Sequence, residues 1–158
     1  MANETNDENR ARRAGLVDRA RGYHDALTAA IEGLERALAA AASTRTGAWS
    51  ERVASELTHV REAIAAHVTD VEEVRGLLDE IELAEPRLAA RVNELRTEHA
   101  DLIERADGLA RRVPSSANAD FRSLRRDIAS VLTVLRSHRG FEADLVFEAF
   151  WADIGAPD

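Results

Sequence analysis

Residues 53–78 read VASELTHVREAIAAHVTDVEEVRGLL. Apolar side chains recur in this segment at steps of three and four residues, which is the period of one face of an α-helix. The stripe consists of Val53, Leu57, Val60, Ile64, His67, Val71, Val74 and Leu78. The pattern predicts a helix from about residue 48 to about residue 82 that turns one imidazole, His67, toward a core.

Three further segments carry the same pattern. They predict helices over residues 8–42, from Pro86 to just before Pro114, and from beyond the loop 113–118 to near Gly155. Pro86 suits the first turn of a helix, where its missing N–H is tolerated. Four long helices joined by short connections predict an all-α fold, an antiparallel up-down-up-down four-helix bundle.

The composition supports this fold. The chain has 158 residues, of which 45% are hydrophobic and only 4% aromatic, and this is the length of one domain. We expect residues 1–7 to form a disordered N-terminal tail and residues 8–154 to form the bundle. The chain has no cysteine, which excludes disulfides, thiolate metal sites and cysteine nucleophiles. A bound metal must therefore use histidine or carboxylate ligands.

The charge pattern narrows the set of partners. The net charge is −8, and the basic residues alternate with acids along the predicted helices, so neither nucleic acid nor an anionic membrane is expected as a partner. No stretch approaches the roughly 20 apolar residues of a membrane span, and we expect a cytoplasmic protein. The sequence contains neither a glycine-flanked nucleophile turn nor a phosphate-binding glycine loop, so no such motif indicates an enzyme. The sequence is compatible with a monomer or a homodimer.

Each predicted helix places one histidine within its apolar stripe. At about 100° per residue, all four of these histidines lie on the core-facing side of their helices. Counted from one end of the bundle, each lies about 14 to 16 residues along its helix, or roughly 20 to 25 Å. We therefore predict that four imidazoles converge at one level: His24, His67, His99 and His138.

A cluster of buried imidazoles needs a partner. The rings would repel one another if protonated, and would leave buried nitrogens unpaired if neutral, unless a metal or a hydrogen-bond network satisfies them. Glu142 lies four residues after His138 on the same face, and its carboxylate suits iron or manganese. The candidate metal ligands are His24, His67, His99, His138 and Glu142.

Three short stretches resemble a known family. They are YHDAL at residues 23–27, LRTEHADL at 95–102 and LRSHRGFE at 135–142. In their order and spacing they resemble the hemerythrin-like, or HHE cation-binding, family of four-helix bundles, over residues 15–154. The resemblance implies that the candidate ligands bind iron in a non-haem, oxo- or carboxylate-bridged di-iron centre. The implied roles are O2 or NO binding, or redox sensing.

The sequence departs from the family at one ligand. The family expects a carboxylate four residues after His67, and Val71 stands there. Asp70 lies about −60° from His67 on an ideal helix, and Glu72 about 140° away, so Glu72 would need a π-bulge to reach the site. Two hypotheses remain open: a hemerythrin-like protein with a mono- or dinuclear iron site, or a degenerate bundle without metal that serves as an interaction or structural module.

Two other patterns are weaker. Glu56 and His59 match the Glu-x-x-His spacing of ferritin-like di-iron bundles, which also need a second such motif that is absent here. His59 lies about 80° from His67, so we expect it at the edge of its helix. Four aromatic residues near the C-terminal end of the last predicted helix favour core packing over an interaction surface. They are Phe141, Phe147, Phe150 and Trp151.

Overall fold

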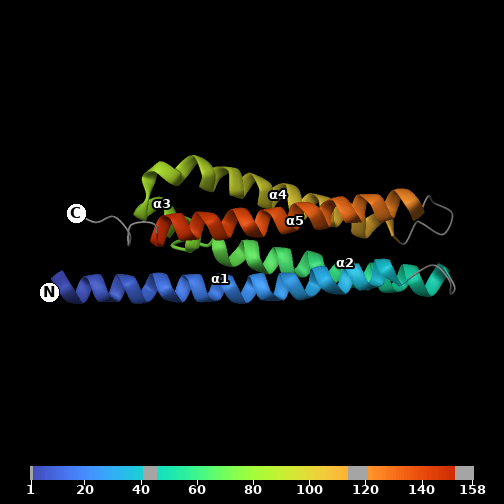
Figure 1. Ribbon diagram of the computed structural model, residues 1–158, viewed down its shortest axis with the longest axis horizontal. Coiled ribbons are helices and arrows are strands. Elements are labelled where there is room, and N and C mark those ends of the chain that lie inside the picture. The colour runs from blue at the N-terminus through green and yellow to red at the C-terminus, as the bar shows by residue number, and fades with distance from the viewer. Residues whose placement is uncertain (1, 41–45, 114–120, 152–158) are drawn as a thin grey trace.

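The computed structural model describes residues 2–40, 46–113 and 121–151 (Figure 1). Its elements are α1 (Ala2–Ala39), α2 (Thr46–Val71), α3 (Leu77–Ala84), the short 3₁₀ helix η1 (Pro86–Leu88), α4 (Ala89–Arg112) and α5 (Phe121–Phe150). The described residues include no strand, and this confirms the all-α prediction. The four long helices lie lengthwise beside one another, with α1 packed against α2, α2 against α4, and α4 against α5 (Figure 1).

The start of the first helix differs from the expectation, and the predicted end of the last one lies outside the residues that the structure describes. Helix α1 begins at Ala2, whereas a disordered tail was predicted over residues 1–7. A helix that is already formed extends at little free-energy cost. Arg12 and Arg13, which follow this segment in α1, pair with the buried carboxylate of Glu80 in α3. The predicted loop beyond residue 113 and the predicted helix end near Gly155 lie outside the described residues.

The structure divides the predicted helix 48–82 into α2 and α3, so the prediction of one continuous helix is wrong. Residues 72–76 form a turn between them, in which Arg75 adopts a positive φ of 64°. The chain passes close to itself at Gly76, where a Cβ atom would lie 2.9 Å from the carbonyl oxygen of Val71. Glycine therefore permits a reversal here that any side chain would obstruct.

Gly140 is a contrasting case, because it lies inside α5 and a methyl group added to it would meet no atom within 4 Å beyond its own helical turn. We expect Gly140→Ala to raise the free energy of unfolding by roughly 0.5–1 kcal/mol, since alanine has less backbone freedom to lose. Gly76→Ala is the comparison variant and should lower the free energy of unfolding, because the added Cβ atom would lie too close to backbone carbonyl oxygens. Urea denaturation of both variants measures the difference. A destabilised Gly140→Ala protein would contradict the expectation.

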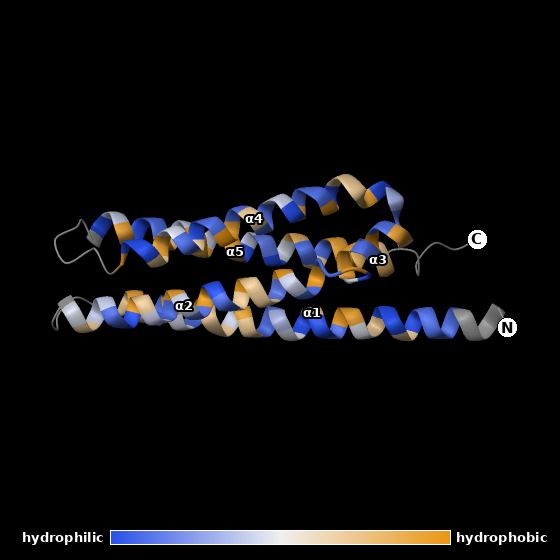
Figure 2. Cartoon of the chain, turned by 180° about the vertical axis from the view of Figure 1, so that it is seen from behind, coloured by the Kyte–Doolittle hydropathy of each residue, from blue (hydrophilic) through white to orange (hydrophobic). Residues whose placement is uncertain are grey.

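The apolar core consists of two clusters. Hydrophobic and polar residues recur in turn along every helix in Figure 2, and the buried apolar ones gather on either side of a polar layer. The α3-side cluster contains Leu16, Val17, Ala20, Val71, Leu77, Leu78, Ile81, Leu88, Val92, Leu95 and Leu145. The distal cluster includes Leu27, Ile31, Leu34, Val53, Leu57, Val60, Ile64, Leu102, Ala106, Leu109, Leu124, Ile128 and Leu135. None of the helices in the described ranges has an apolar stretch that could span a bilayer.

Candidate metal centre

A polar layer separates the two apolar clusters. Each long helix contributes one histidine at the point where it passes from one cluster to the other: His24 from α1, His67 from α2, His99 from α4 and His138 from α5. Neighbouring ring centroids lie 4.8 to 5.8 Å apart. The four imidazoles that the sequence places at one level are therefore brought together by the fold.

Glu142 lies at the centre of this layer. Its Oε2 atom accepts a hydrogen bond from Nε2 of His24 at 3.0 Å, and lies 2.9 Å from Nε2 of His67 and 3.5 Å from Nε2 of His138. One potential ligand atom from each of His67, His99, His138 and Glu142 lies within 4.8 Å of the others. His24 adjoins this group of four and is more open, with its side chain 15% exposed against 1% for Glu142.

Several polar atoms of the layer make no well-aligned hydrogen bond within the described part of the chain. They are Nε2 of His67, His99 and His138, Nδ1 of His67, and Oε1 of Glu142. All four residues are 1% exposed, and a buried polar atom without a hydrogen bond costs free energy of about 1–3 kcal/mol. Three imidazole nitrogens and a carboxylate oxygen are a ligand set that iron, manganese or zinc accepts. The residues therefore fit a metal ion.

Two further carboxylates stand behind the histidines. Nδ1 of His99 lies 2.6 Å from Oε1 of Glu72, and Nδ1 of His138 lies 3.3 Å from Oε2 of Glu98. A carboxylate that accepts from Nδ1–H leaves Nε2 unprotonated, and this is the tautomer that binds a metal. Both histidines are thus oriented with a free nitrogen toward the layer.

Glu72 directly follows α2, which ends at Val71. Its amide still donates to the carbonyl oxygen of Val68 at 3.0 Å, which is the spacing of a helical turn. Its carboxylate reaches the outer nitrogen of His99 and does not join the group of four. Asp70, the other substitute considered, pairs with Arg19 at 3.3 Å. Val71 itself is fully buried in the α3-side cluster and offers no ligand atom.

Sequence reasoning missed Glu98 and underrated Glu72. Glu98 belongs to α4 but supports a histidine of α5, so only the packing of these two helices reveals its role. The sequence offered one signal for Glu72, the glycine four residues later that permits the turn. His59 is 60% exposed and lies 3.6 Å from Glu56, outside the layer. The ferritin-like alternative therefore gains no support from this pair.

Burial sets the protonation of the layer. It acts together with the neighbouring His138 and His67 to lower the pKa of His99 to about 3. Burial also lowers the pKa of His138, against the opposing effect of Glu142. Burial raises the pKa of Glu142, but the hydrogen bond from His24 and the close approach of Nε2 of His67 at 2.9 Å outweigh it and hold this pKa below its usual range. The layer thus combines neutral imidazole at His99 with an ionised carboxylate.

The metal-free protein should lose stability as pH falls. The pKa of His99 is about 3 when folded, against 6.5 for the free group, so the unfolded state binds the extra proton between these values. Stability is then complete above pH 6.5 and declines toward pH 3, with a slope of up to about 1.4 kcal/mol per pH unit for each such proton. Urea denaturation at pH 7, 6 and 5 tests this. A His99→Asn variant should flatten the profile and His59→Asn should not, whereas a flat wild-type profile would contradict the expectation.

Fold and site together define an all-helical protein with a buried histidine and carboxylate cluster that could hold a metal ion. The family model for the hemerythrin HHE cation binding domain matches residues 15–150. The chain belongs to this family, and the resemblance seen in its short motifs is confirmed. Neither the search of curated proteins nor that of solved structures finds a match.

Proposed function

We propose that this protein binds iron in a non-haem site between its four long helices, with O2 or NO as the diatomic ligand or with redox sensing as its role. The observation that carries the proposal is the convergence of unpartnered, buried nitrogen and oxygen atoms in one layer. Imidazoles combined with a carboxylate suit iron. The proposed ligands are His24, His67, His99, His138 and Glu142.

The donor set favours one iron ion per chain. Among the residues that the structure describes, Glu142 is the single inward carboxylate of the layer, and Val71 stands where the family expects another. Glu72 is engaged with the outer nitrogen of His99 and is therefore not free to bridge two ions. A mononuclear site with three or four histidines and Glu142 would give a partner to the orphaned Nε2 atoms of His67, His99 and His138.

Residues 8–154 form, in this proposal, the antiparallel up-down-up-down bundle of the family. Bound iron would supply the redox chemistry and a position for the diatomic ligand. The chain supplies the rest: apolar clusters on both sides of the layer that exclude water, and the carboxylates of Glu72 and Glu98 that hold the Nδ1 protons of His99 and His138. These contacts keep the Nε2 atoms turned inward.

Anaerobic loading with ferrous iron, followed by elemental analysis, tests the proposal. We expect about one iron per chain, and an absorption change when O2 or NO is added. The His67→Ala, His99→Ala double variant should retain no iron, since two of the converging nitrogens are lost. His59→Ala is the matched control, because His59 lies outside the layer. Sub-stoichiometric iron that is indifferent to the double substitution would refute iron binding at this site.

A metal-free bundle that serves as an interaction or structural module is the second candidate. It is supported by the apolar, fully buried Val71 at a position where the family expects a ligand. The two candidate functions predict different effects of iron on the unfolding temperature, because a metal that binds the folded state raises this temperature by mass action. An unfolding temperature that does not change with added ferrous iron would favour the metal-free module.

A further inference from the structure

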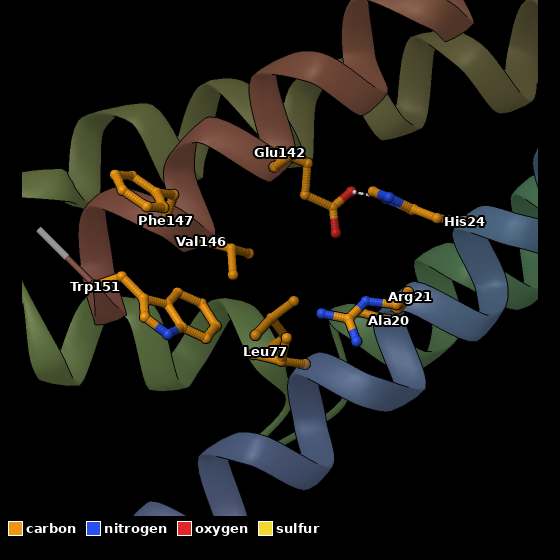
Figure 3. Close-up of a pocket in the computed structure, with 10 residues that line it drawn as sticks. Ala20, Arg21, His24, Leu77, Glu142, Val146, Phe147 and Trp151 are labelled. Carbon is orange, nitrogen blue, oxygen red and sulfur yellow. Dashed lines mark hydrogen bonds and ion pairs between the residues drawn. The ribbon is translucent and has the colours of Figure 1, made fainter.

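A cavity of about 390 Å³ opens beside the polar layer, between α1, α3 and α5. His24 and Glu142 lie at its inner end, and Arg21 extends into it from α1 (Figure 3). Its remaining walls are largely apolar. Six of the side chains that form them are Val17, Ala20, Leu77, Val146, Phe147 and Trp151.

The size of the cavity exceeds the needs of a diatomic ligand. A water molecule occupies about 30 Å³ in the liquid, and a diatomic gas is of similar size, whereas cavities of about 300–1,000 Å³ hold small organic molecules. An adjoining cavity of about 460 Å³ shares Val17 and Trp151 with the first. The space along α1 and α5 therefore suits an elongated body that is apolar within the first cavity, while Asn6, Arg10 and Arg13 add polar side chains to the second.

The aromatic residues at the cavity depart from the core packing expected for them. Phe141 and Phe150 do pack against the α3-side cluster. Phe147 and Trp151, in contrast, are 62% and 41% exposed, and both line the cavity. Exposed aromatic side chains that gather at a concave site are typical of ligand binding.

The charges at the cavity favour an anionic group at its rim. Arg21 has one described ion-pair partner, Asp18 at 3.3 Å, and the two side chains are 68% and 72% exposed. Such a surface pair is weak, so the guanidinium can turn to a carboxylate that binds it through two hydrogen bonds. Glu142 is the one acid among the described lining residues, and it already binds His24.

We propose that this cavity binds a small monocarboxylate with an apolar body. The carboxylate pairs with Arg21, and the body lies against Val146, Phe147 and Trp151. This inference goes beyond metal binding and does not require it, because no lining contact invoked here depends on a metal. The anion stays at the rim, since the inner end of the cavity holds the ionised Glu142.

Decanoate is a suitable probe, with decanol as its uncharged counterpart. Titration of the full chain in a Trp49→Phe background reports binding through the fluorescence of Trp151, which lies in the cavity. We expect saturable binding of decanoate at least about 10-fold tighter than that of decanol. Arg21→Gln should remove this preference, since a hydrogen bond to a charged group corresponds to a factor of about 10 or more.

A bulky residue at Ala143 should close the cavity without disturbing the core, because Ala143 lines the cavity and is exposed. We expect Ala143→Phe to abolish decanoate binding, and Ala66→Phe, at an exposed position of α2, to leave it unchanged. Unaltered unfolding temperatures show that both variants fold. Undiminished binding to Ala143→Phe, or no saturable binding to the wild type, would overturn the proposal.

Two other occupants are tested in the same series. Binding that appears only after deletion of residues 152–158 would assign the cavity to the chain's own C-terminal segment and overturn the proposal. A dimer that Phe147→Ser dissociates would assign it to a second copy, with the same consequence. All titrations are run on metal-free and on iron-treated protein, with iron measured separately. Failure of iron binding and failure of decanoate binding are thereby distinguished.

Discussion

Glu142→Ala is expected to give a protein that retains no iron and, in its metal-free form, unfolds roughly 1–3 kcal/mol more easily. The carboxylate is 1% exposed and lies within 3.5 Å of Nε2 atoms from three histidines. Its removal takes away the one carboxylate of the proposed donor set. It also removes the hydrogen-bond acceptor of His24, so that one more imidazole nitrogen of the layer has no partner.

Elemental analysis after iron loading and urea denaturation of the metal-free protein measure the two effects. Glu148→Ala is the matched control, because Glu148 lies on the same helix and pairs with Arg87 and Arg91 at the surface. A surface ion pair of this kind contributes about 1 kcal/mol or less, and iron retention should be unaffected. Equal iron content in the two variants would remove Glu142 from the proposed site.

Glu72→Gln is expected to weaken iron binding about 10- to 100-fold while the fold is retained. Glu72 is a positioning residue: it accepts from Nδ1 of His99 at 2.6 Å and so keeps Nε2 of that histidine free for the metal. An amide can donate as well as accept at this position, and the tautomer of His99 is then no longer enforced. Competition with a chelator of known iron affinity measures the loss.

Glu73→Gln is the control for this variant. Glu73 is adjacent in sequence, 47% exposed, and paired with Arg19 instead of a histidine. The two variants carry the same charge change, so a difference between them reflects position. If Glu72 mainly stabilised the fold, Glu72→Gln would lower the unfolding temperature of the metal-free protein together with the iron affinity. Equal affinities for Glu72→Gln and Glu73→Gln would show that His99 needs no carboxylate behind it.

The candidate site was largely predictable because it follows from helix geometry. A rotation of about 100° and a rise of about 1.5 Å per residue determine both the face and the height of His24, His67, His99 and His138. Burial of an apolar stripe then requires the four faces to meet. Local sequence therefore indicated the imidazole layer, and the i, i+4 spacing placed Glu142 beside it.

The sequence did not predict the break at residues 72–76 or its consequence for Glu72. The apolar pattern runs on through Val74 and Leu78 as if the helix continued. The close backbone approach at Gly76 and the positive φ of Arg75 become visible only once the chain reverses. Glu72 lies just before this reversal, and only the packing of α4 beside it shows that its carboxylate reaches the outer nitrogen of His99.

Periodicity and residue chemistry alone thus specified an all-helical chain with four inward histidines, and the family resemblance implied that a carboxylate is missing at Val71. Tertiary packing decided which carboxylates stand behind which histidines, because Glu72 and Glu98 act on residues of other helices. Packing also decided that Phe147 and Trp151 line a cavity at the inner end of which Glu142 lies. Such relations join segments far apart in the sequence, and no local pattern encodes the distance between them.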